Sequence, residues 1–274
     1  MGREITLDTI TVGTNFDVFR VEKYLREFGV AVLPGYLSGE VLSELIREFE
    51  LALVDTDDSY AYQIAYDPGR AVSIMTANMP PNRYPAIARV FRDDNFRRLS
   101  ELYVGRDHLL NYEVYATHEH LPGVDVAPTH FDKLWTLKFM IYLQPVDAFD
   151  APFGVVPGSA PSNRQRFRDI FSTHGIKKLR MDDERYQSMN NRAPEDARVV
   201  DITGPAGTLI VFDTDTFHHA GQVEHGHERM ILRGHTGPSV AYESVYKWSS
   251  QWYRGERTPS KMDSLRYGII KRFL

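Results

Sequence analysis

The sequence contains no cysteine. It therefore offers no thiolate for a zinc site or an iron–sulfur cluster, no disulfide and no cysteine nucleophile. Any metal that the protein binds must be held by histidine and carboxylate side chains. The ten histidines of the chain are enough to supply such a site.

Long apolar runs and an excess of positive charge are also missing. No stretch approaches the length of about eighteen apolar residues that spans a membrane, and Met1-Gly-Arg-Glu-Ile5 lacks the apolar core of a signal peptide. The net charge of −5 argues against a general nucleic-acid binder and a polybasic membrane binder. We expect a cytoplasmic protein that acts on a small molecule, with its oligomeric state open.

Apolar patterns predict helices in the first part of the chain and strands in the rest. Helical spacing covers residues 15–28 up to Gly29, and further helices are expected after Ser38 and over 84–104. Strand-like segments are expected at 30–33, 109–115, 136–143, 153–156, 199–202, 208–213 and 229–233. This order predicts a mainly β fold with flanking helices, in which the core is a double-stranded β-helix of the jelly-roll or cupin-like type.

The chain is expected to form a single domain over residues 1–274. A helical N-terminal scaffold would cover about 15–104, and the jelly-roll core would cover about 109–240. Arg, Lys, Asn, Gln and Asp dominate residues 160–198, which we interpret as a polar insert within the core. No internal repeat divides the sequence further.

The most informative motif is His130-Phe131-Asp132. His130 and Asp132 are two residues apart, so on an extended strand their side chains leave the same face. One imidazole and one carboxylate make two thirds of the facial triad that holds non-haem Fe(II) and leaves positions open. His218, which follows the strand-like segment 208–213, is the expected third ligand, and Arg229 lies eleven residues beyond it (229 − 218).

Two neighbouring residues compete for these roles. His219 is the alternative third ligand, although on a strand it would face away from His218. Arg233 shares the strand face of Arg229 and is the alternative to it. The planar, permanently charged fork of an arginine can bind a carboxylate in two places.

The chain resembles the Fe(II)/2-oxoglutarate-dependent oxygenases, and among them the phytanoyl-CoA dioxygenase-like branch. The resemblance is carried by Pro34-Gly-Tyr-Leu-Ser38, His130-Phe-Asp132, Val156-Pro-Gly-Ser159, His218-His-Ala-Gly-Gln222 and Arg229. It implies iron on His130, Asp132 and His218, with Arg229 binding the far carboxylate of 2-oxoglutarate. The implied reaction uses O2 to oxidise, by default to hydroxylate, an unactivated C–H bond of a metabolite or natural-product intermediate, while 2-oxoglutarate is decarboxylated to succinate.

The resemblance also bears on individual positions around the site. Ala220 stands where some relatives carry a hydroxyl residue, so a second contact to 2-oxoglutarate is expected from Tyr115, Thr136 or Lys138. Related halogenases carry a small residue at the position of Asp132. The carboxylate of this chain therefore points to oxygen transfer.

Two other histidine pairs keep alternative functions open. His118-Glu-His120 lies in an expected loop, 116–128, and His225-Gly-His227 lies in an expected polar turn. A cupin-type metalloenzyme that does not use 2-oxoglutarate would take ligands from His118, His120 or His225. A jelly-roll binding protein without catalysis is the other alternative.

The substrate is not identified by any motif. Tyr62, Tyr66 and Trp135 are candidates for lining an apolar pocket, and the insert could meet an anionic group through three basic residues: Lys177, Lys178 and Arg180. Surface charge and core packing are the simpler interpretation of each of these residues.

Overall fold

The strands of the protein form two antiparallel sheets. The structure is a computed structural model that describes residues 4–55, 59–104, 109–124, 128–132, 136–165 and 192–237. The strands are β1 Val30–Leu33, β2 Ala61–Ile64, β3 Gly69–Met75, β4 Leu109–Glu119, β5 Leu137–Tyr142, β6 Phe153–Val155, β7 Val200–Ile202, β8 Leu209–Asp213, β9 His218–Ala220 and β10 Arg229–Gly237. The larger sheet has the order β1-β8-β5-β10-β4-β3-β2, and the smaller has the order β7-β6-β9.

Alternation along the strands gives the larger sheet an outer and an inner apolar face. On β5, Phe139 and Ile141 belong to the outer cluster, whereas Met140 and Tyr142 belong to the inner one. The inner cluster also contains side chains of the smaller sheet, such as Phe153. The two sheets therefore enclose a shared core, and the predicted jelly-roll fold is confirmed.

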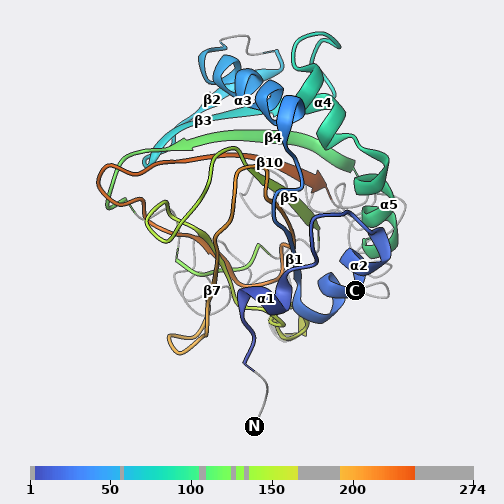
Figure 1. Ribbon diagram of the computed structural model, residues 1–274, viewed down its shortest axis with the longest axis vertical. Coiled ribbons are helices and arrows are strands. Elements are labelled where there is room, and N and C mark those ends of the chain that lie inside the picture. The colour runs from blue at the N-terminus through green and yellow to red at the C-terminus, as the bar shows by residue number, and fades with distance from the viewer. Residues whose placement is uncertain are drawn as a thin grey trace, which may run out of the picture.

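Helices cover the outer face of the larger sheet (Figure 1). They are α2 Val18–Phe28, α3 Gly39–Val54, α4 Pro85–Phe91 and α5 Asp94–Tyr103, whereas the short helix α1 Leu7–Ile10 adds Ile10 to the inner cluster. Asp17 caps the start of α2 by accepting from the backbone N–H groups of Phe19 and Arg20, and Gly29 ends the helix at φ 75°. The helical stretch expected over 84–104 is divided into α4 and α5, because Asp93 caps the second helix by accepting from the Asn95 N–H.

A second correction concerns β4, which is longer than the sequence indicated. Residues 116–119 were expected in a loop, but they continue the strand, because β4 pairs with β10 on one side and β3 on the other. His118 and Glu119 therefore lie on a strand in the middle of the sheet.

Some expectations fall on residues that the structure does not describe. These are Trp135, Lys177, Lys178 and Arg180, most of the expected insert 160–198, and the last residues of the expected core, 238–240. Of the insert, residues 160–165 are helical and 192–198 are described at its other end.

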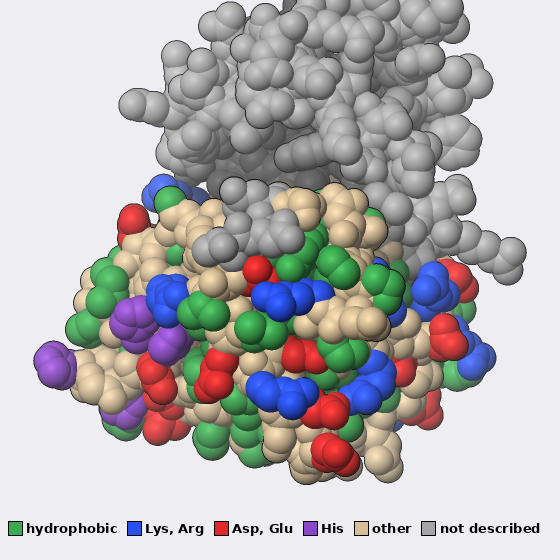
Figure 2. All heavy atoms as spheres, turned by 90° about the horizontal axis from the view of Figure 1, so that it is seen from above, with side chains coloured by type: hydrophobic (Ala, Val, Ile, Leu, Met, Phe, Trp, Pro, Cys, Tyr) green, Lys and Arg blue, Asp and Glu red, His purple; other side chains and the backbone are tan. Residues whose placement is uncertain are grey.

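The described surface has a mixed character. On the face seen in Figure 2, acidic and basic side chains are interspersed over the described part of the protein. No helix among the described residues is both long and apolar enough to cross a membrane.

Candidate metal centre

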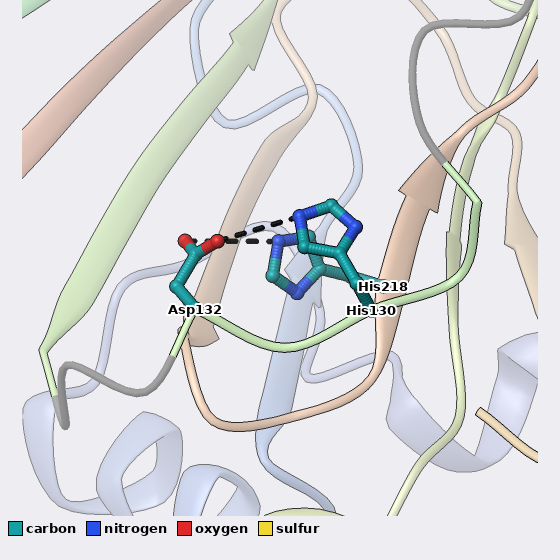
Figure 3. Close-up of side chains that lie close together, drawn as sticks. All are labelled: His130, Asp132 and His218. Atoms are coloured by element: carbon teal, nitrogen blue, oxygen red, sulfur yellow. Dashed lines mark ion pairs between the residues drawn. The ribbon is translucent and has the colours of Figure 1, made fainter. Parts of the chain in front are cut away.

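Three side chains predicted from the sequence come together in space: His130, Asp132 and His218. Each offers one ligand atom, and these atoms lie within 4.8 Å of one another. In Figure 3 the Asp132 carboxylate points toward both imidazole rings. The distances are 3.4 Å from Asp132 Oδ1 to His130 Nε2 and 3.8 Å from Oδ2 to His218 Nε2.

Backbone pairing holds the three residues in place. His218 begins β9, and His130 forms an antiparallel bridge with it, with N–O distances of 2.9 and 2.7 Å. The Asp132 N–H donates to the Thr214 carbonyl at 2.8 Å. His130 was expected on an extended strand, but it pairs only through isolated bridges. The bridges nevertheless place the His130 side chain next to that of Asp132.

The hydrogen bonds of the two histidines prepare them as ligands. His130 Nδ1 lies 2.8 Å from the Pro128 carbonyl, and His218 Nδ1 lies 2.7 Å from the Thr216 carbonyl. Because a carbonyl only accepts, each Nδ1 carries the proton, which leaves the Nε2 lone pair for a metal. Burial, together with Lys138 and His130, lowers the pKa of His218 to about 3, although Asp132 opposes the change.

Lys138 keeps Asp132 in its charged form. Its Nζ lies 2.6 Å from Asp132 Oδ2. Burial alone would raise the pKa of Asp132, but Lys138 and the two histidines hold it well below its usual value. Two imidazole nitrogens and one carboxylate then face a common point, and this donor set fits a divalent metal that keeps positions open for other ligands.

Arg229 lies at the start of β10 and is 1% exposed. Its Nη2 is 2.5 Å from Glu119 Oε2, and Nη1 donates to the Ala151 carbonyl. The Glu119 contact is not aligned as a hydrogen bond, and Arg229 Nε is buried with no hydrogen-bond partner. Tyr66 donates to the other Glu119 oxygen. An arginine with an unused buried N–H fits a further carboxylate.

The three candidates for a second 2-oxoglutarate contact lie in different surroundings. Lys138 contacts Asp132, as described above. Thr136 is buried, and its N–H donates to Thr214 Oγ1 at 3.2 Å. Tyr115 lies edge-on to the His235 ring, with centroids 4.3 Å apart.

The competing residues point elsewhere. His219 Nδ1 is 2.9 Å from Thr129 Oγ1, and His219 is not part of the His–Asp–His group. Arg233 lies over the Tyr115 ring at 5.5 Å and donates from Nε to His235 Nε2 at 3.0 Å. Arg229 and Arg233 are four residues apart on β10 and therefore lie on the same face, as predicted, but they make different contacts.

The other histidine pairs do not join the candidate centre. His118 Nε2 is 2.8 Å from Glu228 Oε2 on the surface. His227, in the expected turn, is 2.8 Å from Asp150 Oδ1 and forms a second three-residue group with Asp150 and Asp147. In the ranges that the structure describes, neither His120 nor His225 belongs to a group of this kind.

Sequence reasoning missed two acidic residues next to the predicted ones. Glu119 was noted only as the middle of a histidine pair, yet it is the partner of Arg229. Glu113 received no role, although Tyr62 donates to it at 3.0 Å. Tyr62 and Tyr66, which were candidates for lining an apolar pocket, contact these carboxylates. The residue next to Arg229 in sequence, Glu228, is acidic but exposed, so the sequence carries no signal that leads to Glu119.

No protein-family model matches the sequence, and no curated protein matches it either. Solved structures do. SnoN, a non-haem α-ketoglutarate-dependent epimerase from nogalamycin biosynthesis, is 15% identical, with a TM-score of 0.54 and coverage of 81% of this chain and 82% of that one.

Two further structures give similar values. HygX from Streptomyces hygroscopicus, solved with nickel and 2-oxoglutarate, is 16% identical, with a TM-score of 0.52 and coverage of 80% and 87%. EctD from S. alaskensis, solved with 2-oxoglutarate and 5-hydroxyectoine, is 15% identical, with a TM-score of 0.53 and coverage of 80% and 75%. At such identities the likeness establishes the fold alone: the chain has the jelly-roll fold that these 2-oxoglutarate-binding proteins share.

Proposed function

We propose that the protein is an Fe(II)- and 2-oxoglutarate-dependent oxygenase of the phytanoyl-CoA dioxygenase-like kind. The observation that carries the proposal is the group formed by His130, Asp132 and His218, whose ligand atoms lie within 4.8 Å of one another. The jelly-roll fold and the 2-oxoglutarate-dependent enzymes that share it support the same reading.

Each residue of the group has a defined task in this proposal. His130 and His218 present Nε2, Asp132 presents a carboxylate oxygen, and Lys138 keeps that carboxylate charged. The two backbone carbonyls that accept from Nδ1 fix the orientation of the rings. When bound, iron and 2-oxoglutarate would supply the oxidising power, with O2, for attack on a C–H bond.

Arg229 binds the far carboxylate of 2-oxoglutarate in this proposal. Its guanidinium is buried, permanently charged and left with an unused Nε–H. A carboxylate there would be held by charge-assisted hydrogen bonds in surroundings that exclude water. Tyr115, Thr136 and Lys138 are the candidates for a second contact; Lys138 already contacts Asp132, and Thr136 Oγ1 lies 3.3 Å from Thr214 Oγ1.

The reaction that we propose is oxidation, most simply hydroxylation, of a C–H bond in a small-molecule metabolite. The carboxylate of Asp132 completes a three-residue ligand set, and a set of this kind suits oxygen transfer. The substrate would approach from the inner face of the larger sheet, where the polar side chains next to Lys138 lie.

The test is consumption of 2-oxoglutarate, followed as succinate, by protein supplied with Fe(II) and O2. The native protein should form succinate slowly even without a substrate, and Asp132→Ala should form none. Asp147→Ala, in the second three-residue group, is the matched control and should behave as the native protein. Tight iron binding without any use of 2-oxoglutarate would instead favour the cupin-type alternative.

A further inference from the structure

A polar wall extends from the candidate centre across the inner face of the larger sheet. It consists of the side chains Lys138, His235, Glu113, Arg233, Tyr115, Ser73 and Tyr62. These residues come from β5, β10, β4, β3 and β2, which are neighbours in the sheet. Apart from Tyr115, one candidate for a second contact to 2-oxoglutarate, the part of the wall beyond Lys138 has no role in the proposed function.

Strand register arranges the wall in two rows. In one row Lys138 pairs with His235, and His235 pairs with Glu113. In the next row Arg233 pairs with Tyr115, Tyr115 pairs with Ser73, and Ser73 pairs with Tyr62. Since neighbouring strands are about 4.8 Å apart, Glu113 begins roughly 10 Å from Lys138, within the length of a small molecule.

Glu113 is a carboxylate prepared to accept from a ligand. It is 7% exposed, and both Tyr62 and Ser73 donate to the same oxygen, Oε1. Among the residues that the structure describes, no cation forms an ion pair with it. A buried carboxylate without a cation is costly, and such a group commonly marks a site where a ligand supplies the missing charge.

Arg233 is the complementary charge. It donates to His235 and lies over the Tyr115 ring, and it forms no ion pair with any described acidic residue. Burial, with Lys138 and Arg233 close by, holds the pKa of His235 well below its usual value, which suits His235 to accept from Arg233. Arg233 and Glu113 are diagonal neighbours on paired strands, and in the described structure they form no ion pair with each other.

We propose that this wall binds the substrate, and that the substrate is a small zwitterion with an ammonium group at Glu113 and a carboxylate at Arg233. This inference rests on the proposed function, because it places the molecule beside the centre that would oxidise it. The two unpaired, opposite charges select a molecule carrying both charges over one that carries either alone. The Tyr115 ring, which lies beside Arg233 and belongs to the same strand as Glu113, would offer an apolar surface to the carbon skeleton.

The inference is tested by binding, with Ni(II) in place of iron and with 2-oxoglutarate present so that no turnover occurs. The probes are the twenty standard amino acids. Each probe that binds is compared with its decarboxylated amine and its N-acetylated form, which lack one charge each. Dissociation constants come from calorimetry, and 2-oxoglutarate binding in the same protein serves as the control for folding.

We expect a zwitterion to bind and each one-charge analogue to bind about 10- to 100-fold more weakly, as the loss of a charged hydrogen bond predicts. Glu113→Gln should weaken the zwitterion and the amine but leave the N-acetylated form almost unchanged. Arg233→Gln should weaken the zwitterion and the N-acetylated form but leave the amine almost unchanged. Neither variant should change 2-oxoglutarate binding by much.

Three results would overturn the inference while the proposed function stands. One is that no zwitterion binds although 2-oxoglutarate does. Another is that the two variants leave zwitterion binding unchanged. The third is that Arg233→Gln abolishes 2-oxoglutarate binding, which would make Arg233 the arginine of the cosubstrate. Failure of the native protein to bind 2-oxoglutarate would instead overturn the proposed function, and this inference with it.

Discussion

At the scale of single residues, the contact between Arg229 and Glu119 affects how a carboxylate ligand can bind to Arg229. Both side chains are 1% exposed, and their charges lie 2.5 Å apart without the alignment of a hydrogen bond. A carboxylate ligand would meet a guanidinium that already has one acidic neighbour. Glu119 therefore neutralises Arg229 when no ligand is present and competes with the ligand when one arrives.

Glu119→Gln should tighten the binding of 2-oxoglutarate. The amide keeps the size of the side chain but removes the negative charge, so we expect the dissociation constant to fall on the order of tenfold. Without ligand the same variant should unfold at a lower temperature, because Arg229 is left buried and uncompensated. Calorimetry and thermal unfolding measure the two effects.

The control for this prediction is Tyr66→Phe. It removes the hydroxyl that donates to Glu119 and leaves the charge in place, so it should not tighten binding. If Glu119→Gln weakened 2-oxoglutarate binding instead, Glu119 would be a residue that orients Arg229 for the ligand.

Residue spacing predicted the ligands of the candidate metal centre better than it predicted the acidic partner of Arg229. Because His130 and Asp132 are two residues apart, their side chains were expected on the same side of the chain. His218 was expected to join them because it follows a strand-like segment, and the three residues do form one group. The partnership of Glu119 and Arg229 could not be predicted in this way. It depends on the register between β4 and β10, which brings together residues 110 positions apart (229 − 119).

At the scale of elements, the end of α2 is coupled to the position of His218. Gly29 adopts φ 75° after the helix, and its carbonyl accepts from Thr216 Oγ1 at 3.1 Å. The Thr216 carbonyl in turn accepts from His218 Nδ1. A scaffold helix thus sets the orientation of a candidate ligand through two hydrogen bonds.

Gly29→Ala should destabilise the protein more than Gly39→Ala does. Both glycines have positive φ, which costs a residue with a side chain about 1–2 kcal/mol. A methyl group at Gly29 would also overlap Thr216 Oγ1, whereas at Gly39 it would meet open space. We expect a further loss of about 1–3 kcal/mol for Gly29→Ala in urea unfolding.

The same pair of variants tests the coupling to the centre. Gly29→Ala should also weaken metal binding, because Thr216 must move, and Gly39→Ala should not. Equal effects of the two variants on metal affinity would contradict the coupling.

The pair formed by His227 and Asp150 joins two loops and should stabilise the protein in a pH-dependent way. Its hydrogen bond to Asp150 raises the pKa of His227. The stabilisation is therefore fully present below the unfolded value, about 6.5, and is lost as the pH rises through the higher folded value. Although burial opposes it, the Asp147 N–H and His227 lower the pKa of Asp150, which keeps its charge at mildly acidic pH.

The free energy of unfolding should accordingly differ more between the native protein and His227→Gln at mildly acidic pH than at alkaline pH. Urea unfolding measures the difference near pH 5.5 and pH 8.5, about one unit below and about two units above the usual histidine pKa. His225→Gln, exposed in the same turn, should show no such change. A larger difference at the higher pH would contradict the sign of the effect.

Elements were predicted well where apolar periodicity was strong and poorly where pairing overrode it. The helix ending at Gly29 and the strand at 30–33 were correctly placed. The continuation of β4 through residues 116–119 was missed, since the run Ala-Thr-His-Glu has little apolar strand character. Strands on both sides impose the extended conformation there, and the sequence of one strand does not show its neighbours.

At the scale of the whole molecule, the candidate ligands connect distant parts of the chain. His130 and His218 are 88 residues apart (218 − 130), and Lys138, which contacts Asp132, belongs to the larger sheet. A metal held by this group would link the smaller sheet to the segment that leads into β5. Binding should therefore stabilise the folded protein as a unit.

Ni(II) at a thousand times its dissociation constant should add about 4 kcal/mol to the free energy of unfolding. The melting temperature should rise with metal concentration and return after chelation. His218→Ala should lose the effect, and His225→Ala should keep it. An equal rise in both variants would place the metal outside the group.

The most direct measurement is the visible spectrum of the protein with Fe(II) and 2-oxoglutarate in the absence of O2. If both bind at the same centre, a weak charge-transfer band should appear only when both are present. The band should vanish in His218→Ala and weaken in Arg229→Gln. Bound iron that gives no band on addition of 2-oxoglutarate would contradict the account.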